Sequence, residues 1–171
     1  MQSKIKSNQM VRKIAHTASI AALYVVLTGV SSAFGLSYSG IQFRLSEMLT
    51  ILPVFSPFAV TGLTLGCFIS NLASPLGIID IIFGTFSTFI SACLTRLLSE
   101  IKIKNIPILA PLPPVVMGAV VVGAMLSFLM PEGFSFYAFF ASAISVGIGQ
   151  FVMCYGFGIP LYLFLNKTNI F

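Results

Sequence analysis

The chain has 171 residues, of which 57% are hydrophobic and only 8% are charged, and its mean hydropathy is +1.03. Soluble proteins carry roughly 25% charged residues, so this composition excludes a water-soluble globular domain. The formal net charge of +5 comes from a few positive residues beside apolar segments, which is typical of membrane topology and not of a nucleic-acid-binding surface. At about 20 residues per membrane-spanning helix, the chain has room for roughly six or seven spans and for no sizeable domain outside the bilayer.

The first apolar stretch, at about residues 15–34, follows a basic segment, residues 1–14. The stretch is longer than the roughly 7–15 apolar residues of a signal-peptide core, and further hydrophobic segments follow it. We therefore predict a retained first span behind a basic cytoplasmic tail. A loop rich in glycine and serine, residues 35–40, ends this span because such a sequence does not continue a helix.

Prolines and glycines divide the remaining apolar sequence into further segments. Five more spans are expected, at about residues 43–52, 58–73, 77–98, 115–130 and 137–165. The segment 43–52 is the shortest, because an α-helix of that length reaches only ~15 Å at ~1.5 Å per residue. It therefore needs neighbouring protein, a tilt or an extension to cross the membrane.

The positive residues decide the predicted topology. Lysine and arginine favour the cytoplasmic side of a membrane protein, and here they gather in the N-terminal segment, around the linker 99–114 and at Lys167. These places share one side only if segment 43–52 crosses the membrane. The sequence therefore predicts an all-α integral membrane protein of six transmembrane helices, a single membrane domain over residues 1–171 with both termini cytoplasmic.

Residues with catalytic or metal-binding chemistry are scarce. The three cysteines, Cys67, Cys93 and Cys154, lie in apolar segments without a Cys-x-x-Cys or Cys/His spacing, which indicates small buried side chains. The sequence contains no nucleotide-binding loop, acidic metal cluster or Ser-His-Asp set. We therefore expect no catalytic residue, no metal and no cofactor in this chain.

Three polar residues are predicted to lie near the outer end of the bundle. Glu47 comes early in the second span, Asn71 late in the third and Asp80 early in the fourth. An ionisable group near the hydrocarbon is unfavourable unless it faces a partner or a cavity. We therefore expect these side chains to converge on an outward-facing pocket.

The same residues also have structural explanations. Arg44 lies one helical turn before Glu47 and could neutralise it. Asp80 could stabilise a helix N-terminus, where a negative charge is favoured, and Asn71 could satisfy the backbone of the following turn. Gln150 lies in the middle of an apolar segment, where an amide binds either another helix or a ligand.

Small residues at a spacing of four form a second pattern. Ala18 and Ala22 share one face of the first span, and Gly62 and Gly66 share one face of the third. Such faces let another helix approach closely. They indicate either packing inside the bundle or contact with a separate membrane subunit.

Short strings along almost the whole chain carry a resemblance to a known family. The most specific string is IQFRLSE at residues 41–47, accompanied by Asn71 and Asp80. The others are AALYVVLT at residues 21–28, GLTLGC at 62–67, FGT at 83–85 and GFGIPL at 156–161. Together they resemble the queuosine-precursor transporter (QueT) family.

This resemblance implies a substrate-binding S-component of an energy-coupling factor (ECF) transporter. Such subunits are six-helix proteins of the plasma membrane that capture a vitamin-like solute. They associate with a transmembrane T-component and two cytoplasmic ATPase subunits, so ATP would be used by these partners. The face formed by Ala18 and Ala22 would contact the T-component.

The resemblance also implies a substrate, a 7-deazaguanine such as 7-aminomethyl-7-deazaguanine. One carboxylate can accept the two adjacent N–H donors of its ring and a second can balance its ammonium group. Glu47 and Asp80 are the candidates, in either order. The remaining candidates are the amides Asn71, Gln42 and Gln150, the stacking rings Tyr38 and Phe43, and the flanking Arg44. The alternatives are an S-component for another vitamin-like solute, or a non-transporting membrane scaffold or channel whose polar residues are structural.

Overall fold

The computed structural model describes residues 2–36, 43–131 and 133–168, and these residues are almost entirely helical. Four helical stretches come first: α1 (Gln2–Ala33), the 3-10 helix η1 (Leu45–Val54), α2 (Phe58–Asn71) and α3 (Ile78–Leu98). The last two stretches are continuous but contain a π-helical turn. One runs through α4 (Leu112–Met117), η2 (Gly118–Val122) and α5 (Gly123–Phe128), and the other through α6 (Phe136–Phe151), η3 (Val152–Phe157) and α7 (Gly158–Thr168).

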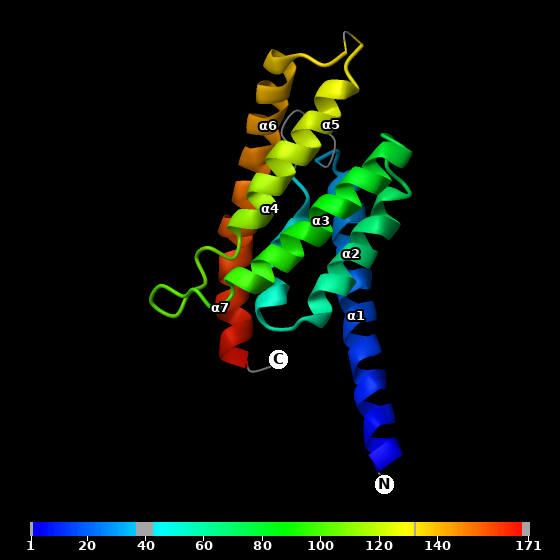
Figure 1. Ribbon diagram of the computed structural model, residues 1–171, viewed down its shortest axis with the longest axis vertical. Coiled ribbons are helices and arrows are strands. Elements are labelled where there is room, and N and C mark those ends of the chain that lie inside the picture. The colour runs from blue at the N-terminus through cyan, green and yellow to red at the C-terminus, as the bar shows by residue number, and fades with distance from the viewer. Residues whose placement is uncertain (1, 37–42, 132, 169–171) are drawn as a thin grey trace.

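The helical stretches alternate in direction along the bundle (Figure 1). The beginning of α1 and the end of α7 lie at the same end of the molecule, drawn at the bottom, and the linker between α3 and α4 lies toward that end as well. The turn between α2 and α3 and the turn between α5 and α6 lie at the opposite end. This arrangement agrees with the predicted order of six passes.

Three helical stretches are long and apolar enough to cross a membrane: Met10–Ala33, Ile78–Leu98 and Phe136–Thr168. Three shorter apolar helices, Leu45–Val54, Phe58–Asn71 and Leu112–Phe128, accompany them. The distribution of polarity is that of a protein in lipid. Phenylalanine, leucine and isoleucine side chains are exposed on the outside, whereas serine and threonine hydroxyls are buried between the helices. Some of these hydroxyls bond to a carbonyl of their own helix, as Ser31 does to Leu27, and others bond to another element, as Thr95 does to the Ala110 carbonyl; lipid offers neither kind of partner.

The short second segment lies inside the bundle. It forms a 3-10 helix, whose rise of about 2.0 Å per residue gives its ten residues a length of about 20 Å instead of ~15 Å. Most of its side chains are buried, so neighbouring helices surround it, as its length requires. The Arg96 guanidinium of α3 donates hydrogen bonds to the carbonyl oxygens of Pro53 and Val54, at 3.1 and 3.0 Å, and so caps the end of η1.

Two helices extend beyond the predicted spans. Helix α1 begins at Gln2, so the basic segment before the span predicted at about residues 15–34 belongs to the same helix. The basic segment contains neither proline nor glycine, and lysine, glutamine and arginine favour helices. The fifth stretch begins at Leu112, three residues before the expected start, because prolines are tolerated in the first turn of a helix.

The end of α1 was predicted correctly, and glycine is the reason. Gly35 has a φ of +70°, in the left-handed region where a side chain is strained. Its amide donates to the Ser32 carbonyl and the Leu36 amide donates to the Ser31 carbonyl, both at 2.9 Å. This pair of bonds is a Schellman motif, which closes a helix at a glycine.

Helices α1 and α2 pack closely because α2 carries two glycines on the contact face. A Cβ atom at Gly62 would lie 2.9 Å from the Ile20 Cβ atom, and one at Gly66 would lie 2.7 Å from the Tyr24 Cβ atom. Both distances are shorter than normal van der Waals contact. The Gly62/Gly66 spacing therefore serves packing inside the bundle, which was one of the two explanations left open.

We expect Gly66→Ala to destabilise the protein by about 1–3 kcal/mol, the usual range for overpacking a close contact. The matched control is Gly29→Ala on α1, where no atom lies within 4 Å of the added methyl group. There the alanine should be neutral or stabilising by up to about 1 kcal/mol, because alanine favours helices over glycine. Unfolding of both variants in detergent measures the difference, and equal stabilities would contradict the packing assignment.

Candidate substrate site

The 3-10 form of η1 aligns two polar residues, and a third precedes them. In a 3-10 helix the side chains at i and i+3 eclipse each other, so Glu47 and Thr50 lie one above the other, while Arg44 is the N-cap residue with an extended backbone. We call these three residues the polar column. In an α-helix they would fan out around the axis, because 3.6 residues complete a turn. All three residues line the same internal cavity.

Four parts of the chain enclose this cavity with η1. Helix α3 contributes a small, hydroxyl-rich face, and the opposite wall comes from α4, η2 and α6. The lining residues beyond the polar column are Gly84, Ser87, Thr88, Ser91, Pro114, Gly118, Val122, Val146 and Gln150. The α3 residues follow a spacing of three and four, which places them on one helix face. The cavity volume is about 30 Å³, room for about two water molecules.

Glu47 is the carboxylate that faces the cavity. Its side chain is only 6% exposed, and its Oε1 atom accepts a hydrogen bond of 2.7 Å from the Tyr24 hydroxyl of α1. The side chain of Gln150 lies beside the carboxylate as well. An ionised carboxylate has about four acceptor positions, so these neighbours leave it capacity for a ligand.

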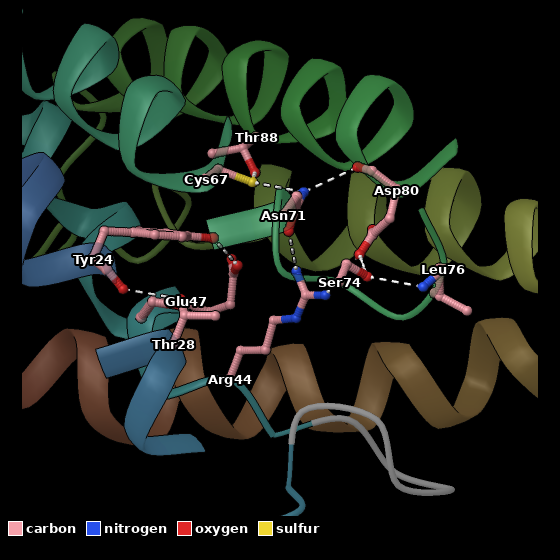
Figure 2. A network of polar contacts seen from close by, with 11 residues as sticks. Tyr24, Thr28, Arg44, Glu47, Cys67, Asn71, Ser74, Leu76, Asp80 and Thr88 are labelled. Carbon is pink, nitrogen blue, oxygen red and sulfur yellow. Dashed lines mark hydrogen bonds and ion pairs between the residues drawn. The ribbon is translucent and has the colours of Figure 1, made fainter. Parts of the chain in front are cut away.

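Asp80 and Asn71 hold Arg44 from behind the cavity (Figure 2). The Arg44 guanidinium forms an ion pair of 3.4 Å with Asp80 Oδ2 and donates a 3.5 Å hydrogen bond to Asn71 Oδ1. The Ser74 hydroxyl donates to the same Asp80 carboxylate at 2.5 Å. The Asn71 amide also donates to the Asp80 backbone carbonyl at 2.9 Å. These contacts form a polar network that joins the beginning of η1 to the end of α2 and the beginning of α3.

The four charged and amide residues of the predicted pocket fall into two groups. Glu47 and Arg44 line the cavity, whereas Asp80 and Asn71 are absent from its lining although both are buried. Gly84 makes the network compact, because a Cβ atom there would lie 2.6 Å from the Asn71 amide nitrogen and 3.0 Å from Asp80 Oδ1. An ion pair joins Arg44 to Asp80, which is 36 residues distant.

Gln150 reaches the cavity from α6. Its side chain packs on Gly118, where a Cβ atom would lie 3.0–3.1 Å from the Gln150 side-chain atoms. Its Oε1 atom accepts a 3.5 Å contact from the Cys154 thiol, which also lies 3.5 Å from the Thr50 hydroxyl. Gln150 therefore contacts both its own helix and the cavity. The π-helical turns η2 and η3 adjoin Gly118 and Gln150, and such turns are frequent at functional sites.

Three residues of α1 that carry a hydroxyl group were not among the predicted site residues. Tyr24 bonds to Glu47, the Thr28 hydroxyl donates to the Ser46 hydroxyl at 2.8 Å, and the Ser31 hydroxyl accepts from the Leu45 amide at 2.9 Å. Together they attach the beginning of η1 to α1. Their spacing of four and three along an apolar span places them on one face, and this spacing is the signal that could have revealed them.

The other predicted residues lie elsewhere. Tyr38 and Gln42 fall outside the described residues. Phe43 is half-buried outside the cavity lining, and its amide donates to the Leu36 carbonyl at 2.9 Å. Ala18 and Ala22 are exposed on α1, away from its contact with α2. Among the described residues, no group of three histidine, cysteine or acidic side chains is placed to hold a metal ion.

Over the described residues, a helical bundle with an apolar exterior and a buried cavity lined by a carboxylate, a guanidinium and an amide is the architecture of a membrane protein. Comparison with known proteins agrees: the chain matches the QueT transporter family over residues 14–167. The chain belongs to the QueT transporter family.

A curated relative supports this assignment. The chain is 41% identical over 83 residues to the queuosine precursor transporter QueT of Lactococcus lactis subsp. cremoris (strain MG1363). This alignment spans 48% of the chain and 48% of the relative, about half of each protein. No solved structure matches the chain.

Proposed function

We propose that the chain is the substrate-binding S-component of an ECF transporter that takes up a queuosine precursor, a 7-deazaguanine such as 7-aminomethyl-7-deazaguanine. The observation that carries this proposal is the buried cavity at which Glu47, Arg44 and Gln150 meet from η1 and α6 in a member of the QueT transporter family. A carboxylate at this position suits the paired N–H donors of a guanine-type ring.

The polar network refines the roles proposed for the acidic residues. Glu47 is the better candidate for direct contact, because its carboxylate adjoins the cavity. Asp80 and Asn71 are proposed to position Arg44, to which both are bonded. The hydroxyls of Ser87 and Ser91 on α3 add polar contacts at the cavity wall. Tyr38, Gln42 and Phe43, which precede η1 in the sequence, stay candidates for contact.

Substrate binding requires the cavity to widen. A volume of about 30 Å³ is far below the roughly 300 Å³ or more of typical ligand pockets. The wall formed by η2 and α6 is the best candidate for this movement, because the π-helical turn η2 interrupts the regular backbone ladder in this wall and a second one, η3, follows α6. Helix α3, by contrast, is a regular α-helix over its whole length.

The proposed partners are a transmembrane T-component and two cytoplasmic ATPase subunits, which would supply ATP hydrolysis, so that this chain needs no cofactor of its own. The exposed face of Ala18 and Ala22 supports the first contact, because small residues let a partner helix approach closely in lipid. The Gly62/Gly66 face is not a candidate for this contact, since α1 covers it.

We propose a location in the plasma membrane with both termini cytoplasmic. Lys102→Cys in the linker should then be labelled by a membrane-impermeant thiol reagent only after cell disruption, because positive residues favour the cytoplasmic side. Ser135→Cys, in the turn before α6, should be labelled in intact cells. Both positions are exposed. Labelling of Lys102→Cys from outside would reverse the proposed orientation.

Binding by the purified chain tests the proposed function. We expect the wild type to bind 7-aminomethyl-7-deazaguanine in calorimetry, and Glu47→Gln to weaken binding by about 1.5–3 kcal/mol, the range for hydrogen bonds to a charged group. Glu100→Gln, an exposed carboxylate in the linker, is the matched control and should bind as the wild type does. Binding of a different vitamin would favour another S-component, and binding of no solute would favour a scaffold.

A further inference from the structure

The polar column presents a hydrogen-bond donor next to an acceptor. Arg44, the N-cap residue of η1, and Glu47, in the first turn of η1, both line the cavity. A guanidinium has only donors and an ionised carboxylate only acceptors. This wall of the cavity therefore offers a donor beside a pair of acceptors.

This arrangement complements one edge of a guanine-type ring. Along that edge lie a carbonyl oxygen, a ring N–H and an exocyclic amino group, in other words one acceptor followed by two donors. Resting on the proposed function, we infer that Glu47 accepts hydrogen bonds from the ring N–H and the amino group while Arg44 donates to the carbonyl oxygen. The transporter would then select rings that carry both a 2-amino and a 6-oxo group.

The polar network explains why Glu47, and not Asp80, has this role. The Asp80 carboxylate is 1% exposed and engaged by Arg44 and Ser74, and it does not line the cavity. The same engagement holds the Arg44 guanidinium at its place in the column. Glu47 is held by the Tyr24 hydroxyl through one oxygen, Oε1, so its carboxylate is oriented before a ligand arrives. Pre-oriented partners of this kind increase discrimination between similar ligands.

Three ring probes test the inference in calorimetry with the purified full chain. They are 7-deazaguanine, 7-deazahypoxanthine, which lacks the 2-amino group, and 7-deaza-2,6-diaminopurine, in which an amino group replaces the carbonyl. The wild type should bind the first at least roughly tenfold more tightly than either of the others, because each change leaves a buried polar group without its partner. Equal binding of the three probes would overturn the inference, whatever the variants do.

The variant Glu47→Gln tests whether Glu47 is the residue that distinguishes 7-deazaguanine from 7-deazahypoxanthine. A carboxamide offers one acceptor and one donor in place of two acceptors, so the 2-amino group gains little from it. The preference for 7-deazaguanine over 7-deazahypoxanthine should fall below about threefold, whereas Glu100→Gln should keep the wild-type preference. If Glu47→Gln weakens both probes equally and keeps their ratio, Glu47 does not bind the amino group, and the inference fails while the proposed function stands. If the wild type binds no deazaguanine at all, both fail.

Discussion

Replacement of Asp80 by asparagine is expected to lower the free energy of unfolding by about 3–5 kcal/mol, the range for removing one partner of a buried ion pair. This range applies because the ion pair is buried: the side chains of Arg44 and Asp80 are only 11% and 1% exposed. The substitution leaves the Arg44 guanidinium without its counter-charge inside the bundle. Urea or thermal unfolding of the purified chain in detergent measures the loss.

The double variant Asp80→Asn with Arg44→Gln is the control for this explanation. It removes both charges, so the buried guanidinium that destabilises the single variant is gone, and a large part of the lost stability should return. Glu47→Gln provides a second comparison, because it changes a carboxylate that bonds to a neutral tyrosine hydroxyl, and it should destabilise the chain less. If the double variant is less stable than Asp80→Asn by the full effect of Arg44→Gln, the two side chains act independently and the ion-pair explanation is wrong.

Leucine or tryptophan at both Ala18 and Ala22 is expected to abolish ATP-dependent uptake and co-purification with a T-component. Association of helices in lipid depends on close packing, because lipid chains are as apolar as the side chains. Large side chains on this exposed face should therefore prevent contact with the T-component. Solute binding by the isolated chain should stay nearly unchanged, because the cavity lies among η1, α3, α4, η2 and α6 and not on this face.

Leu23→Trp is the matched control on the same helix. Leu23 is exposed and follows Ala22 in sequence, but it points about 100° away around the helix axis. Its replacement should leave both assembly and uptake close to wild type. Loss of solute binding in the Ala18/Ala22 variants, in parallel with loss of assembly, would show that these alanines support the bundle itself.

Much of the architecture follows from the sequence, because each feature depends on local composition. Uncharged runs of membrane length predicted the helical bundle, and the glycine- and serine-rich sequence of residues 35–40 predicted the end of α1. The helices that extend beyond the predicted spans, at Gln2 and Leu112, begin where a basic or proline-containing segment is compatible with a helix and the sequence has no sharper signal.

The candidate site was only partly predictable. Glu47, Asp80, Asn71 and Arg44 stood out because charged and amide groups are unfavourable in lipid without partners. Their sequence positions, however, say nothing about the rotation of each helix around its axis. Packing decides that rotation, and here it turns Asp80 and Asn71 toward Arg44 and leaves Glu47 at the cavity.

The sequence by itself therefore determined the all-helical class of the protein, its apolar segments and the residues that need a polar environment, since these depend on transfer from water to lipid. The tertiary structure alone decided the 3-10 form of η1, the hydrogen bond from Tyr24 and the pairing of Arg44 with Asp80. The physical reason is that all three depend on contacts between segments distant in the chain. Only the close approach of helices, through Gly66 against Tyr24 and Gly84 against Asn71, brings those segments together.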